Sequence, residues 1–388
     1  MILEHVRPLG GATVDVRIAD GRIAGFTPST REGTAALLLP GLIEGHCHLD
    51  KTLWGQPWWR NDVGPTLMDR IDNEKATRRA ISMDAGREGR ALCEAHLAAG
   101  TTRLRSHVDI DEESRLSHVE KLLALREEMR GVMEIQLVAF PQSGILRTPG
   151  VEEWLDEALR MGCDAMGGLD PSLIDRDPVR HLDIVFKLAA RHGKPVDLHL
   201  HEPGELGAFS MELIAERARA LGMQGRVVIS HGFALGDVAP SRADALLSML
   251  AEAGVALCTS VPPSRAVPPL RRARELGVTL FAGNDNIRDT WSPHNAPDML
   301  ARAAMVALKY ELRRDEDVAL ALDAVTVASA RACGFSDYGL EVGARADLVV
   351  VDAASVAEAV VTRRPPGLVF SHGLLVARDG QLVGSPGN

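Results

Sequence analysis

The chain has 388 residues, of which 46% are hydrophobic and 25% charged, and its formal net charge is −10. This length suffices for one large barrel with a smaller satellite domain, and the composition is that of an ordinary globular protein. The negative charge, with no basic stripe to offset it, argues against a nucleic-acid partner.

The five cysteines are scattered and form no C-x-x-C pair. Such cysteine usage fits a reducing cytoplasm and excludes a thiolate zinc site. The sequence shows neither a signal-peptide pattern nor an apolar run long enough for a bilayer. We therefore expect a cytoplasmic protein with no membrane partner, and its barrel helices are compatible with a homo-oligomer.

Both ends of the chain are predicted to be rich in β-structure. Alternating apolar residues near the N-terminus predict a hairpin over 14–26, with its turn at Asp20-Gly21. Three strand-like runs lie near the C-terminus, at 347–351, 368–370 and 374–376. We expect residues 1–38 and 344–388 to form one small β-sandwich domain.

The middle of the chain alternates short apolar runs with amphipathic helical stretches such as 113–128, 151–161 and 211–221. Eight strands are predicted, the first before His46 and the others at 102–110, 134–140, 165–169, 196–201, 227–231, 255–259 and 278–283. This alternation predicts the α/β class and a parallel (β/α)8 TIM-like barrel over 39–343. Its active site would lie at the carboxyl ends of the strands.

Polar residues of metal-ligand type follow several of these strands. His46-Cys47-His48 ends the first strand, and residues two apart in a strand point to the same side. His199, His231 and Asp285 end three others. A barrel brings all these ends to one rim, although each histidine alone is more often a structural residue.

Neutral imidazoles with one carboxylate suit a divalent ion such as Zn2+ or Fe2+. The fourth strand, 165–169, carries no lysine that could bridge two ions after carboxylation. The expected cofactor is therefore one divalent metal ion.

Five short segments carry a further pattern: 45–52 (GHCHLDKT), 138–142 (VAFPQ), 199–202 (HLHE), 230–231 (SH) and 284–286 (NDN) with Trp291. Together they resemble the amidohydrolase superfamily, and within it bacterial cytosine deaminase and its relatives acting on aminopyrimidines and triazines. The resemblance runs from about residue 14 to about 385 and includes the small β-domain.

The resemblance implies a metal-ligand set and a proton acceptor. The ligands would be His46, His48, His199 and Asp285, and Asp285 would also take a proton from the attacking water. His201 competes with His199 for the ligand position because both face the same side of the strand, but the H-x-x-E spacing favours His199.

Further roles are implied for residues around the ligands. His231 would hydrogen-bond the attacking hydroxide, and Glu202 would move protons to the ring nitrogen and the leaving amine. Gln142 would bind an amide edge of the substrate ring, and Trp291 would lie beside it. His107 is interpreted as a structural or supporting residue.

Two departures concern substrate rather than metal. Cytosine deaminases usually carry a second Asp where this chain has Asn286, which changes the hydrogen bonds offered to the ring. The segment 260–264 is short and proline-rich. Trp54, Trp58 and Trp59 follow the H-x-H motif and are either substrate contacts or ordinary packing residues.

The expected function is hydrolytic deamination of a small nitrogen heterocycle, with cytosine, 5-methylcytosine or isocytosine as the first choice. The alternative is an amidohydrolase that opens a cyclic amide or removes an alkylamine from an s-triazine, like N-isopropylammelide hydrolase. A metal-free binding protein on the same fold is a third hypothesis, which the intact ligand set makes weak.

Overall fold

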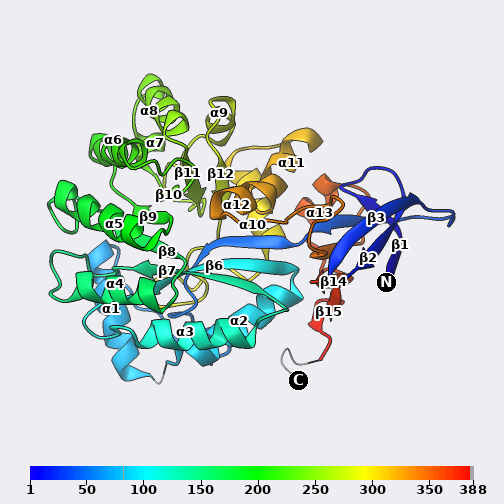
Figure 1. Cartoon of the computed structure of the whole chain (residues 1–388), viewed down its shortest axis with the longest axis horizontal. Coiled ribbons are helices and arrows are strands. Elements are labelled where there is room, and N and C mark those ends of the chain that lie inside the picture. Colours follow the sequence, from blue (N-terminus) through cyan, green and yellow to red (C-terminus); the bar gives the residue numbers. More distant parts are fainter. Residues whose placement is uncertain (82, 385–388) are drawn as a thin grey trace.

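The computed structural model describes residues 1–81 and 83–384. Eight parallel strands pair in chain order to form a barrel (Figure 1). They are β5 (Leu42–Cys47), β6 (Thr101–Asp109), β7 (Glu134–Phe140), β8 (Ala165–Leu169), β9 (Val196–Leu200), β10 (Val227–His231), β11 (Val255–Thr259) and β12 (Leu280–Ala282). The α/β barrel predicted from the sequence is confirmed.

The barrel closes between its first and last strands. Cys47 and Asp285 form a parallel bridge, and the amide of Asp285 donates to the carbonyl of His46 at 2.7 Å. Gly283 makes this approach possible, because a Cβ there would lie 2.6 Å from three atoms of His46. The closure thus places two predicted ligands side by side.

Helices surround the barrel (Figure 1). They are α1 (Leu67–Ala80), α2 (Ala85–Ala98), α3 (Ser117–Glu128), α4 (Val151–Met161), α5 (Pro178–His192), α6 (Gly204–Ala220), α7 (Ala234–Asp237), α8 (Pro240–Glu252), α9 (Leu270–Glu275), α10 (Met299–Lys309), α11 (Asp315–Asp323), α12 (Val327–Cys333) and α13 (Val356–Thr362). Helix α6 begins seven residues before the predicted 211, since Pro203 is tolerated at a helix start. Helix α1 was not predicted, because its sequence is strongly polar.

The two chain ends build a separate mixed sheet in the order β16-β15-β14-β13-β4-β1-β2-β3. Its strands are β1 (Ile2–Pro8), β2 (Val14–Ala19), β3 (Arg22–Pro28), β4 (Ala36–Pro40), β13 (Leu348–Val351), β14 (Leu368–Ser371), β15 (Leu374–Arg378) and β16 (Gln381–Leu382). We propose the small-domain limits 1–38 plus 344–388 and the barrel limits 39–343 as the division of the chain.

Strand β4 joins the two parts by its alternating side chains. Leu37 and Leu39 belong to the barrel's hydrophobic core, whereas Leu38 belongs to the core of the mixed sheet. Successive strand residues point to opposite faces, so one strand serves two cores.

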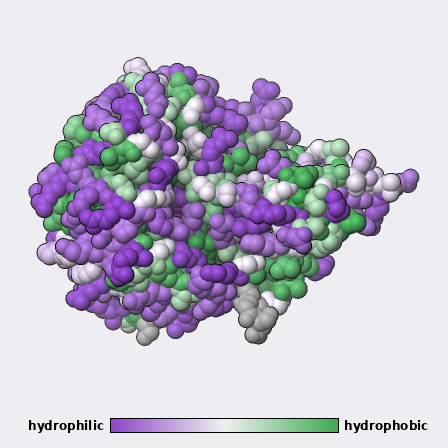
Figure 2. Space-filling model, viewed as in Figure 1, coloured by the Kyte–Doolittle hydropathy of each residue, from purple (hydrophilic) through white to green (hydrophobic). Residues whose placement is uncertain are grey.

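Among the described residues, no helix is long and apolar enough to cross a membrane. The barrel side of the face in Figure 2 is predominantly hydrophilic, and larger hydrophobic areas lie over the mixed sheet.

Candidate functional site

The carboxyl ends of three barrel strands, together with the segment after β12, bring four ligand-type side chains together. One ligand atom each from His46, His199, His231 and Asp285 lies within 4.8 Å of the others. His48 joins them, since its Nε2 is 3.4 Å from Asp285 Oδ1 and 3.4 Å from His199 Nε2. The structure therefore brings together every ligand predicted from the sequence, with His231 beside them.

His231 and Asp285 adopt left-handed backbone conformations, with φ of 73° and 63°. A non-glycine residue in such a conformation costs on the order of 1–3 kcal/mol and persists where surrounding structure imposes it. Two such residues in one cluster indicate that the backbone is arranged for the site rather than for stability.

A hydrogen-bond relay fixes the orientation of His46. Its Nδ1 is 2.9 Å from Ser230 Oγ, and that hydroxyl donates to Asp197 Oδ1 at 2.8 Å. Because the serine proton is used by Asp197, His46 Nδ1 must carry the proton and Nε2 must present a lone pair. Arg105 Nη1 donates to the same carboxylate at 2.9 Å. This arrangement is typical of the residues that orient metal-binding histidines.

The nitrogens that meet in the cluster fit a divalent cation. His46 Nε2 and both nitrogens of His231 are buried without a hydrogen-bond partner among the described residues, and the Nε2 atoms of His48 and His199 face each other at 3.4 Å. Buried polar atoms are rarely left unpaired, so this concentration calls for a ligand. Burial lowers the pKa of His48 to about 4 and those of His199 and His231 well below their ordinary value. Neutral imidazoles are the form that binds a metal.

The cluster opens into a cavity of about 390 Å³. Its lining comprises His48, Lys51, Pro65, Arg70, Phe140, Gln142, Leu169, His199, His201, His231, Phe233, Ser260, Pro262, Ser264, Arg265, Asp285, Asn286 and Trp291. All three residues predicted to contact substrate, Gln142, Asn286 and Trp291, are in this lining.

Gln142 presents a free donor to the cavity. Its Oε1 lies 3.4 Å from Lys51 Nζ, which can only donate, so Nε2 is the amide atom left over. Nε2 is buried and has no partner in the described part of the chain. An oxygen atom of a bound ring would accept a hydrogen bond from this Nε2.

Lys51 is a site residue to which sequence reasoning assigned no role. It is buried, 3.1 Å from Asp109 Oδ1 and 3.6 Å from Glu74 Oε2, and its Nζ lies 5.0 Å from the ring centroid of Trp291. Burial alone would lower the pKa of Lys51, but Asp109 and Glu74 raise it above the ordinary value. Its position three residues after His48 was the available signal.

Helix α1 is attached to the site through the same charges. Glu74 on α1 accepts a hydrogen bond from Trp291 Nε1, and Arg78 on α1 donates to Asp109 Oδ2 at 2.6 Å. These contacts link the helix to the strand ends, which explains how a polar segment without a clear apolar stripe comes to border the cavity.

Glu202 lies next to the site but is not part of the cavity lining. Its Oε1 accepts from the amides of Ser172 at 2.6 Å and Leu173 at 2.9 Å, and Ser210 Oγ donates to Oε2. Burial is the largest cause of the raised pKa of this carboxyl. Both oxygens are therefore engaged by residues that are not part of the cavity lining.

The neighbouring His201 does line the cavity. Its Nδ1 is 2.8 Å from Asp170 Oδ2, and its ring stacks on that of His231 at 4.2 Å between centroids. The ligand-atom cluster contains His199 and not His201.

His107 and the three tryptophans after the H-x-H motif occupy other places. The ring centroid of His107 lies 4.2 Å from that of His46, and its Nε2 is 3.8 Å from Asp197 Oδ1. Trp54, Trp58 and Trp59 are absent from the cavity lining, and Trp58 is 71% exposed.

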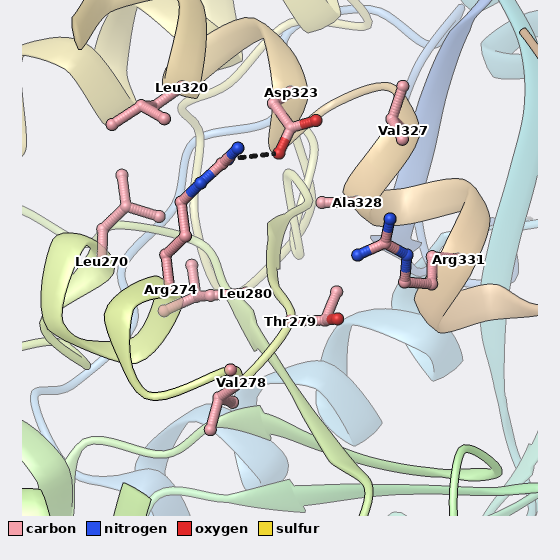
Figure 3. Close-up of a pocket in the computed structure, with 11 residues that line it drawn as sticks. Leu270, Arg274, Val278, Thr279, Leu280, Leu320, Asp323, Val327, Ala328 and Arg331 are labelled. Atoms are coloured by element: carbon pink, nitrogen blue, oxygen red, sulfur yellow. Dashed lines mark hydrogen bonds and ion pairs between the residues drawn. The ribbon is translucent and has the colours of Figure 1, made fainter. Parts of the chain in front are cut away.

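A second cavity, of about 190 Å³, lies at the opposite end of the barrel, beside the start of β12 (Figure 3). Asp323 is its one lining carboxylate, and Arg274 pairs with it at 3.0 Å. This cavity has no histidine in its lining, so it does not fit the predicted metal chemistry.

A parallel barrel with histidines and a carboxylate gathered at its strand ends is typical of barrel hydrolases that bind a divalent metal. Residues 35–383 match the amidohydrolase family, and the chain belongs to that family. It is therefore an enzyme acting on carbon–nitrogen bonds.

Similar proteins include enzymes named for triazine and pyrimidine substrates. N-isopropylammelide isopropyl amidohydrolase of Pseudomonas sp. (strain ADP) is 29% identical over 94% of this chain and 92% of its own. The crystal structure of N-isopropylammelide isopropylaminohydrolase from Burkholderia multivorans ATCC 17616 aligns with a TM-score of 0.95 and 50% identity, covering 98% of this chain and 99% of that one. The structure of 5-methylcytosine deaminase from Klebsiella pneumoniae liganded with 5-fluorocytosine aligns with a TM-score of 0.88 and 28% identity over the full length of both.

Proposed function

We propose that this enzyme hydrolyses the exocyclic carbon–nitrogen bond of an oxo-substituted s-triazine that carries an N-substituted amino group. The alternative drawn from the sequence includes this reaction beside the opening of a cyclic amide, and the 50% identity to a protein named for N-isopropylammelide supports it over deamination of cytosine. The observation that carries the proposal is that His48, His199 and Asp285 of the ligand cluster line one cavity together with Gln142, whose amide nitrogen has no partner among the described residues.

The proposed cation ligands are His46, His48, His199 and Asp285, with Zn2+ or Fe2+ as the ion. When bound, such an ion supplies Lewis acidity that makes water nucleophilic near neutral pH. The unpaired nitrogens of these histidines support the assignment.

Protein groups would orient the substrate and move its protons. Gln142 Nε2 donates to a ring oxygen and Trp291 covers the ring face. Asp285 accepts a proton from the attacking water, and His231 hydrogen-bonds the attacking oxygen. The water oxygen forms a bond to the ring carbon, the carbon–nitrogen bond breaks, and the amine leaves after gaining a proton. Water is the only co-reactant.

The proton donor to the leaving amine has two candidates. Glu202 is the predicted one, although its oxygens are bonded to Ser172, Leu173 and Ser210. His201 borders the cavity, so we propose it as the competing donor. Since a general acid contributes roughly 10²–10⁴-fold, Glu202→Gln and His201→Asn should differ clearly in kcat at equal metal content.

The function is tested by a steady-state screen that measures amine release from N-alkylamino-dioxo-triazines and ammonia release from aminopyrimidines. The expected result is a higher kcat/KM for the triazines, abolished on chelation and restored by Zn2+ or Fe2+. Absence of turnover on every compound after metal loading would refute the proposal.

Deamination of 5-methylcytosine or a related aminopyrimidine is the second candidate. It is favoured by the full-length likeness to the 5-methylcytosine deaminase structure. Ammonia release from these compounds at a higher kcat/KM than amine release from triazines would select it.

A further inference from the structure

The charges around the active-site cavity are unevenly balanced. Its lining holds three cationic side chains, Lys51, Arg70 and Arg265, but only one carboxylate, Asp285. Lys51 is neutralised by Asp109 and Glu74, and Asp285 belongs to the ligand cluster. The two arginines therefore leave an uncompensated positive charge at the cavity.

Neither arginine forms an ion pair in residues 1–81 and 83–384. Both are exposed, whereas Gln142, His199 and His231 in the same lining are buried. The guanidinium groups consequently stand at the cavity mouth, and the ligand cluster lies deeper.

Arg265 is held against the wall that leads to the ligand cluster. Its guanidinium carbon lies 4.5 Å from the ring centroid of Phe233, and its Nη2 donates to the carbonyl of His201 at 3.4 Å. Phe233 and His201 both line the cavity, and His201 stacks on His231. These contacts leave Nε and Nη1 of Arg265 free for a ligand.

The sign of this charge opposes that of the whole protein. A net charge of −10 repels anions, so two guanidiniums at one opening create a local field of the opposite sign. Guanidinium groups recognise carboxylates through paired, charge-assisted hydrogen bonds.

We propose that the amino substituent of the substrate carries a carboxylate, which Arg265 and Arg70 recognise at the cavity mouth. This inference rests on the proposed function, because it requires the ring to lie beside Gln142 with its amino substituent directed toward the cavity mouth. The released amine would then be an amino acid rather than a simple alkylamine.

Two substrates that differ in one group test the proposal. One is the isopropylamino-dioxo-triazine, and the other replaces one isopropyl methyl with a carboxylate, so that its leaving group is alanine. Both rings are identical, and ring ionisation therefore cannot account for a difference. The expected result is a kcat/KM on the order of tenfold higher for the carboxylate, the size of one hydrogen bond to a charged group.

The substitutions Arg265→Gln and Arg70→Gln should reduce this ratio toward one. Arg331→Gln is the matched control, since Arg331 is exposed, lines the cavity at the opposite end of the barrel (Figure 3) and forms no ion pair in the described part of the chain. The control should keep the wild-type ratio.

Calorimetric titration of the metal-free protein with the same two compounds separates this inference from the proposed function. Tighter binding of the carboxylate by the metal-free protein, with no hydrolysis of either compound by the metal-loaded enzyme, would support the inference and refute the function. Hydrolysis of both compounds with a ratio of one or less would overturn the inference and leave the function standing. An unchanged ratio in both arginine variants would also overturn it.

Discussion

The two ends of the barrel differ in whether their largest buried polar side chains are paired. Where the barrel meets the mixed sheet, Arg103 is fully buried and paired, with Asp347 at 3.3 Å and Asp337 at 3.2 Å. At the carboxyl ends of the strands, His46, His199 and His231 keep buried nitrogens without partners. The first pattern holds two parts of the protein together, and the second leaves capacity for a ligand. The concentration of unpaired imidazole nitrogens thus marks the functional end, whereas the unpaired groups at the start of β6 are the single hydroxyls of Thr101 and Thr102.

The largest expected effect is at the functional end. His199→Ala removes a proposed metal ligand, and we expect a loss of metal and a decrease in kcat/KM of roughly 1000-fold or more, measured by elemental analysis and steady-state kinetics. His192→Ala, which changes a histidine paired with Asp156 on the barrel exterior, should retain both. Full metal content in His199→Ala would contradict the ligand assignment.

The paired end should respond in stability instead of activity. Arg103→Met leaves Asp347 and Asp337 without this partner, so we expect the free energy of unfolding to fall by about 3–5 kcal/mol in denaturant titrations. Arg22→Met removes an exposed pair with Asp337 and should cost about 1 kcal/mol or less. An equal decrease in the free energy of unfolding for the two variants would contradict the difference expected between buried and exposed ion pairs.

The role of ligand orientation can be tested by a substitution that leaves every proposed metal ligand intact. Ser230→Ala breaks the relay from His46 to Asp197, and metal affinity should decrease roughly 10–100-fold, as for other residues that orient ligands. Competition with a chelator measures this affinity. Ser248→Ala removes a hydroxyl on α8 and should leave affinity unchanged.

The free donor of Gln142 predicts a smaller effect on substrate. Gln142→Glu keeps the shape and the contact with Lys51 but removes the N–H donor, so kcat/KM should fall about tenfold with metal content unchanged. Gln224→Glu on the exterior is the matched control. An unaltered KM and kcat would show that the donor does not meet substrate.

His96 extends the comparison, because it is buried and forms no hydrogen bond among the described residues but lies outside the ligand cluster, with its Nε2 3.9 Å from Glu44 Oε2. Burial lowers its pKa to about 3, whereas the unfolded chain protonates histidine near its ordinary value. Between about pH 6.5 and 3 the unfolded state therefore binds more protons, and folding stability falls as the pH falls.

The free energy of unfolding of the wild type should lose up to about 1.4 kcal/mol per pH unit in this range relative to His96→Leu. Denaturant titrations at several pH values measure the difference. Parallel pH profiles would show that His96 is protonated in the folded protein.

Most strands of the barrel could be predicted from local sequence patterns. The predicted strands at 134–140, 165–169, 227–231 and 255–259 agree with β7, β8, β10 and β11. Buried parallel strands are short apolar runs between amphipathic helices, and this signal is local in sequence. Helix α1 was not predicted, because the contacts that attach it to the site are made to residues distant in the sequence.

The sequence by itself determined the fold class, the family and the set of ligand-type residues, because periodicity and short motifs are properties of neighbouring residues. Only the tertiary structure decided which polar atoms are already paired. Both oxygens of Glu202 accept hydrogen bonds from residues outside the cavity lining, and Lys51 binds Oε1 of Gln142, which leaves its Nε2 as the free donor. Arg70 and Arg265, far apart in the chain, line the same cavity. These outcomes depend on contacts between residues far apart in the chain, and a hydrogen bond made elsewhere is invisible in a motif.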